Sequence, residues 1–137
     1  MAFVKQVEEV RGSSPFKPFK FENVGDKLTF LFMGVEDAQS PTYGTFEVVR
    51  GLEFNPNASS VEEALTTASL VSFPMQTQIA NKINNGLMRP REAYSIEMIW
   101  KKGDKYDGNK ICKSNGYKIE HLILDEEARK ALIKKFN

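Results

Sequence analysis

The segment KLTFLFMGV, residues 27–35, constrains the fold most, because it has the pattern of a strand that is apolar on both faces. Two apolar sets alternate along it, namely Leu28, Phe30 and Phe32 on one face and Leu31, Met33 and Val35 on the other. Such a strand is covered on both sides along part of its length. We expect it to bend or bulge at Gly34, where the side chain is missing.

The rest of the chain alternates between strand patterns and short helix patterns. Four further segments have strand character, at residues 43–54, 69–75, 93–102 and 117–124. Ser60 and Glu63 form a capping-box pattern that predicts a helix over about 61–67. Thr77 is the predicted cap of a second helix, and a third helix is predicted over 125–137, with acidic residues at its start and lysines near its end.

The resulting order, β-β-β-α-β-β plus a C-terminal helix, is the layout of the OB fold, a small and partly open five-stranded barrel. We therefore predict a mostly β protein with a single domain over 1–137, since most domains have about 100–150 residues. It divides into an N-terminal arm (1–22), a barrel (23–124) and the C-terminal helix (125–137). An SH3-like barrel and an α+β sandwich are the alternatives.

Three phenylalanines precede the first long strand and alternate with two lysines: Phe16, Phe19 and Phe21 with Lys17 and Lys20. This pattern fits a segment that packs over the barrel, and it also fits a nucleic-acid contact. We favour the packed segment.

Several classes of site find no support in the sequence. The single cysteine, Cys112, excludes an internal disulfide and a multi-cysteine zinc site. No glycine-rich phosphate loop occurs, so no nucleotide cofactor is predicted. The only histidine, His121, lies inside a predicted strand, and the acidic pairs are explained as helix caps or solvated charge. We therefore predict no catalytic residues, no metal and no cofactor, and we do not expect an enzyme.

The chain also lacks an apolar run of 18 residues, and its first residues lack the apolar core of a signal peptide. The expectation is a cytoplasmic protein without a membrane partner.

The segment from residue 100 to residue 118 carries the strongest functional signal. The net charge is only +1, yet these nineteen residues hold six lysines and three aromatic residues. Lysines can hold phosphates while aromatic rings stack on bases, although simple solvation of a surface loop also explains lysines. The predicted nucleic-acid contacts here are Trp100, Lys101, Lys102, Lys105, Tyr106, Lys110, Lys113, Tyr117 and Lys118.

Two further predicted contacts lie on the second strand. Tyr43 lies on the polar face of this strand. Arg50 interrupts the apolar face beside Gly51, and its side chain could point into a groove there. Trp100 and Tyr117 are equally compatible with core positions.

Four stretches, NVGDKLTFLFMGVED, TYGTFEVV, YSIEMIWKKGDK and NGYKIEHLIL, together resemble the small OB-fold single-stranded DNA-binding proteins of bacteriophages. The resemblance implies coating of transient single strands during replication, recombination or repair. It implies contacts at Tyr43, Trp100 and the lysines at 101, 102 and 105. The chain departs from that family in its basic C-terminal helix, where many members have an acidic tail, and in a longer insertion at about 55–69.

The sequence thus predicts a sequence-tolerant, phage-encoded protein that binds single-stranded DNA, with self-association and contacts to replication or recombination proteins left open. One alternative is a non-enzymatic interaction or assembly module of a phage or plasmid, whose adhesive element is the helix face of Ala128, Leu132 and Phe136. Another is an OB module that binds RNA.

Overall fold

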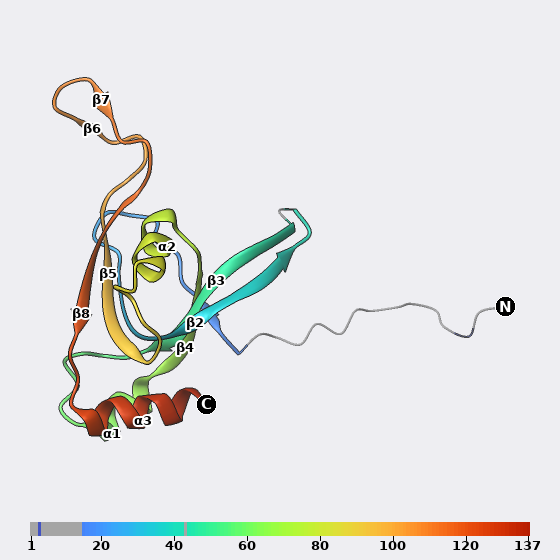
Figure 1. Cartoon of the computed structure of the whole chain (residues 1–137), viewed down its shortest axis with the longest axis vertical. Helices are drawn as coiled ribbons and strands as arrows, with labels where there is room; N and C mark the ends of the chain where they lie inside the picture. Colours follow the sequence, from blue (N-terminus) through green and yellow to red (C-terminus); the bar gives the residue numbers. More distant parts are fainter. Residues whose placement is uncertain (1–2, 4–14, 43) are drawn as a thin grey trace.

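The computed structural model describes residue 3 and residues 15–42 and 44–137. Within them the protein is mostly β, with three helices and a six-stranded sheet (Figure 1). The strands are β1 (Lys17–Pro18), β2 (Lys27–Ser40), β3 (Gly44–Glu53), β4 (Ser69–Pro74), β5 (Glu92–Trp100), β6 (Lys105–Tyr106), β7 (Lys110–Ile111) and β8 (Gly116–Leu122). The helices are α1 (Val61–Thr67), α2 (Thr77–Asn84) and α3 (Glu126–Phe136).

The main sheet has the strand order β1-β4-β3-β2-β5-β8. All neighbours are antiparallel except β1 and β4, which are parallel. Helices α1 and α3 lie side by side at one end, and the separate β6–β7 ladder projects from the opposite end (Figure 1). The mostly β class is therefore confirmed.

The predicted barrel is not closed, because no ladder joins β4 to β8 in the described part of the chain. The outer edge of β4 is occupied by β1, and the pairing continues where the Phe19 N–H donates to the Ser72 carbonyl at 2.8 Å. On β8, the side-chain amide of Gln78 donates to the Tyr117 carbonyl at 2.7 Å and accepts from the Tyr117 N–H at 2.9 Å. Other groups thus fill the hydrogen-bonding positions that a closing ladder would use.

Phenylalanine rings from the segment before β2 cover the gap between these two edges. The Phe21 ring contacts Phe73 on β4 and Tyr117 on β8, with centroid distances of 5.8 and 5.1 Å. Phe16 lies 5.9 Å from the ring of Phe136 in α3. The favoured interpretation, a segment packed over the sheet, is confirmed for the part from residue 15 onward, whereas residues 1–2 and 4–14 lie outside the described residues.

The first half of β2 is buried on both faces, as its sequence predicts. Val35 was predicted on the face of Leu31, but it packs against the core of Phe30 and Phe32, because the register shifts at Gly34. The main core contains Leu28, Phe30 and Phe32 from one face, and a second core contains Leu31 from the other. Leu132 of α3 is 3% exposed and belongs to the second core, against which Phe136 also packs. The apolar face of α3 is thus used inside the fold, so the hypothesis of an adhesive C-terminal helix loses its main support.

The first hairpin is longer than predicted. The strand patterns at 27–35 and 43–54 leave the polar residues 36–42 as a connector, yet β2 continues to Ser40 and pairs with β3 as a projecting ribbon (Figure 1). Three of the residues that extend β2 beyond Val35, namely Glu36, Asp37 and Gln39, are exposed. The predicted irregularity at Gly34 is confirmed, because the register shifts between Phe32 and Gly34, whose φ is 153°.

The helices begin close to where their caps predict. The Ser60 hydroxyl accepts from the Glu63 N–H at 3.1 Å, and the Glu63 carboxylate accepts from the Ser59 N–H at 2.8 Å and from its hydroxyl group. The side-chain hydrogen bond from Ser59 is the main cause that lowers the pKa of Glu63. The prediction that Thr77 caps the second helix is wrong. Thr77 is the first helical residue of α2, and the N-cap is Gln76.

Candidate nucleic-acid interface

The connector predicted between the last two strands forms a two-stranded hairpin, here named the lysine arm and defined as residues 101–115. Its base is closed by the Gly103 N–H, which donates to the Cys112 carbonyl at 2.9 Å, and by the Cys112 N–H, which donates to the Asp104 carbonyl at 2.8 Å. Asp107 and Gly108 adopt φ of 45° and 86°, the left-handed values that such a tight turn needs. An Asp-Gly pair is typical of such turns, so the sequence itself indicates a turn at these two residues.

Two side chains fix the base of the lysine arm through backbone groups. The Asp104 carboxylate accepts from the Lys101 N–H, and the Asn115 side-chain oxygen accepts from the Lys102 N–H, both at 2.8 Å. Because these bonds engage main-chain groups, the ammonium groups of both lysines remain available.

The Gly-Asp pair ahead of β2 also positions this region. The Gly25 N–H donates to the Met98 carbonyl at 2.8 Å, and the Met98 N–H donates to the Asp26 carbonyl at 2.9 Å. Backbone N–H groups of Asn23 and Glu22 hydrogen-bond the Asp26 carboxylate and lower its pKa, and the nearby charge of Lys101 adds to the effect. A persistent negative charge thus sits beside the base of the lysine arm.

The predicted lysines are all exposed. Only Lys118 has an ion pair, with its ammonium 3.6 Å from the Glu120 carboxylate. The others, Lys101, Lys102, Lys105, Lys110 and Lys113, form no ion pair with any residue that the structure describes. Five unpaired cations on one projecting hairpin favour attraction of a polyanion.

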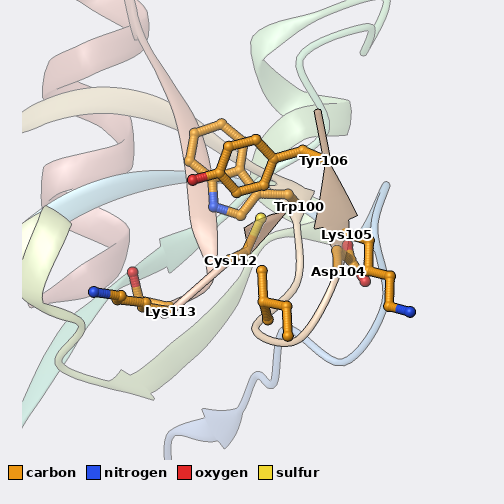
Figure 2. A pocket seen from close by; sticks show the side chains of 8 residues that line it. Trp100, Asp104, Lys105, Tyr106, Cys112 and Lys113 are labelled. Atoms are coloured by element: carbon orange, nitrogen blue, oxygen red, sulfur yellow. The ribbon is translucent and has the colours of Figure 1, made fainter. Parts of the chain in front are cut away.

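Two aromatic rings from this region line one open pocket of about 740 Å³. Trp100 at the end of β5 is 44% exposed, and Tyr106 on β6 is 49% exposed. Figure 2 shows both rings at the pocket, with the side chains of Lys105 and Lys113 extending in opposite directions. We name this hollow the aromatic pocket. It combines apolar surface with cations, as binding of a base and its phosphate requires.

The orientation of Trp100 depends on the glycine across the ladder. Gly116 is its cross-strand partner, and a Cβ built on Gly116 would lie 2.0 Å from Cε2 of the indole. The six-membered ring therefore occupies the space that any other side chain would need. This close approach holds the indole against β8 while almost half of it remains accessible.

Two predicted contacts are placed elsewhere. The Tyr117 ring is 4% exposed and packs against Phe21, so it offers no free face to a base. Arg50 forms an ion pair with Glu36, and its guanidinium lies 4.5 Å from the centroid of Phe16. These partners hold Arg50 against the β2–β3 ribbon, outside the residues that line the aromatic pocket. Tyr43 lies outside the described residues.

Sequence reasoning missed Ile111 and Cys112 as pocket residues. Ile111 is 53% exposed and pairs with Lys105 across the β6–β7 ladder. The ladder closes over three residues, 107–109, whereas a two-residue turn at Asp107 and Gly108 would pair Lys105 with Lys110, so the sequence alone did not indicate this pairing.

The remaining chemistry of the described residues is limited. His121 lies 5.1 Å from the ring of Tyr94 in a stacked arrangement, with Nε2 3.2 Å from a Glu92 carboxylate oxygen. No group of three or more metal-ligating side chains occurs in the described ranges. None of the helices found there is long and apolar enough to cross a lipid bilayer.

Comparison with known proteins gives no further guide to function. No protein-family model, curated protein or solved structure matches this chain.

Proposed function

We propose that this protein binds single-stranded DNA, through the lysine arm and the aromatic pocket, with little dependence on sequence. The observation that carries the proposal is the pair of half-exposed rings, Trp100 and Tyr106, within a projecting group of unpaired lysines. Resemblance to phage single-stranded DNA-binding proteins suggests that the bound strands are the transient ones of replication, recombination or repair.

The strand order supports an OB-type fold for this role. Strands β2, β3 and β4 form a meander, α2 follows, β5 returns to pair with β2, and β8 pairs with β5. OB folds commonly bind ligands with the connectors between their first and second and their fourth and fifth strands. The lysine arm is the connector between β5 and β8, which are the fourth and fifth strands of that order.

The two kinds of side chain contribute differently to binding. Each lysine that neutralises a phosphate releases counterions, so affinity falls as the salt concentration rises. Each base that stacks on a ring contributes about 1–3 kcal/mol and does so for any base. In a duplex the bases are already stacked on one another, so the exposed rings favour single strands.

A fluorescence titration tests the proposal directly, because Trp100 is the only tryptophan in the chain. We expect oligo-dT to quench its emission at about 50 mM salt and the affinity to fall at about 200 mM. Lys130→Ala is the matched control for lysine substitutions in the arm, since Lys130 is an exposed lysine of α3, at the opposite end of the molecule (Figure 1).

Matched duplex DNA and RNA oligomers serve as competitors in the same titration. Stronger competition by RNA would favour the RNA-binding alternative. Absence of binding to every single-stranded probe at about 50 mM salt would refute the proposed function.

A further inference from the structure

A second, smaller pocket of about 300 Å³ adjoins the aromatic pocket, and Trp100 and Ser114 line both. It lies between the base of the lysine arm and the first turns of α2. We name it the amide pocket, because its polar lining consists of amide and hydroxyl side chains: Gln76, Thr77, Gln78, Asn81, Ser114 and Asn115. Trp100 and Tyr117 complete the lining, and no charged residue contributes to it.

Part of this lining is rigid. Gln78 is held by its two hydrogen bonds to the peptide groups of Tyr117, at 2.7 and 2.9 Å. The Asn115 amide accepts from the Lys102 N–H at 2.8 Å and donates to the Tyr117 hydroxyl at 3.4 Å. These two side chains are already ordered, so they lose little entropy when a ligand enters.

Two other polar side chains of the amide pocket, Asn81 and Thr77, are exposed to solvent and unpaired among the described residues. An amide offers a donor and an acceptor side by side, which is the pattern that complements the edge of a nucleobase.

The two pockets differ in charge, and this difference separates their ligands. Lys105 and Lys113 line the aromatic pocket, whereas the amide pocket has no cation to balance a phosphate. Its volume is at the lower end of the range for small-molecule sites, which suits one base better than a longer segment.

We propose that the amide pocket receives the edge of one nucleobase of the bound strand, next to Trp100, while the phosphates follow the lysine arm. This inference rests on the proposed function and adds a base-selective subsite to otherwise sequence-tolerant binding. Asn81 is the residue we assign to reading the base.

The test compares the dissociation constants of oligo-dA, oligo-dC and oligo-dT for the wild type and two variants. Asn81→Ala removes the free amide, and Asn84→Ala is the matched control, because Asn84 is an exposed asparagine of α2 outside the pocket. In the wild type we expect the best and worst homopolymers to differ by about fivefold or more. This ratio should shrink in Asn81→Ala and persist in Asn84→Ala.

Comparing ratios between variants cancels the self-stacking of the DNA, which is the same for every protein. If all variants bind tightly with the same base ratios as the wild type, the subsite is refuted while the proposed function stands. If the wild type binds none of the homopolymers, the proposed function fails and the subsite fails with it.

Discussion

Replacing Gly116 with alanine should disturb DNA binding through Trp100 alone. The added Cβ would lie 2.0 Å from Cε2 of the indole, whereas real Cβ contacts are essentially never shorter than 3.0 Å and ordinary ones begin at 3.4 Å. The ring must therefore move by at least about 1.0 Å, and by about 1.4 Å to reach ordinary contact. Stacking contributes about 1–3 kcal/mol per base, which corresponds to about 5- to 150-fold in affinity. We expect the affinity for oligo-dT to fall by a factor within this range if the displaced indole no longer stacks on a base. Fluorescence anisotropy of a labelled oligo-dT of about 12 nucleotides measures the loss.

A double-mutant cycle isolates the cause. In a Trp100→Ala background the obstructing indole is gone, so Gly116→Ala should have no further effect on affinity. Thermal unfolding followed by circular dichroism checks that both proteins remain folded. The reasoning is refuted if Gly116→Ala binds like the wild type, or if it lowers affinity equally in both backgrounds.

Three further predictions follow from the described contacts. Substituting Lys105 and Lys113 together with alanine should reduce the slope of log affinity against log salt by about 1.4, since each phosphate contact on a single strand contributes about 0.7. The lowered pKa of Glu63 stabilises the fold above its ordinary value of 4.5, and this contribution is lost as the pH falls through the folded value. Glu63→Gln should therefore lower the melting temperature at pH 7, and the difference from wild type should shrink below about pH 4. Gln78→Ala should lower the free energy of unfolding in urea by about 1–3 kcal/mol, because both peptide groups of Tyr117 lose a partner.

Each of these predictions has a contradicting outcome. An unchanged salt slope would show that the two lysines are not phosphate contacts, and Lys130→Ala gives the reference slope. A difference in melting temperature that stays constant as the pH falls from about 7 to about 3 would contradict the role of the Glu63 carboxylate. Wild-type stability of Gln78→Ala would mean that water replaces its hydrogen bonds at no cost.

The elements with a strong local signal could be predicted from the sequence. The two-faced pattern of residues 27–35 led to a strand between two cores, and Ser60 with Glu63 led to α1. The Asp-Gly turn of the lysine arm was also visible, because it needs a backbone conformation that few other pairs adopt.

Features that depend on distant parts of the chain could not be predicted. The edge of β8 is satisfied by Gln78, 39 residues earlier in the chain, and no local pattern announces that bond. The burial of Tyr117 depends on Phe21, and the pairing of Arg50 depends on the unexpected length of β2, which brings Glu36 opposite β3. Part of the neutral lining beside Trp100 comes from α2, namely Thr77, Gln78 and Asn81, and the sequence does not reveal that this helix packs there.

The segment that runs from β1 to Phe21 has a consequence for any shortened form of this protein. A chain that begins at residue 22 would leave β4 with a bare edge and would uncover the apolar side chains of Phe73 and Tyr117. Bare strand edges pair readily with other chains and lead to aggregation. Removing residues 1–21 to isolate the sheet would therefore yield a protein that aggregates through the edge of β4.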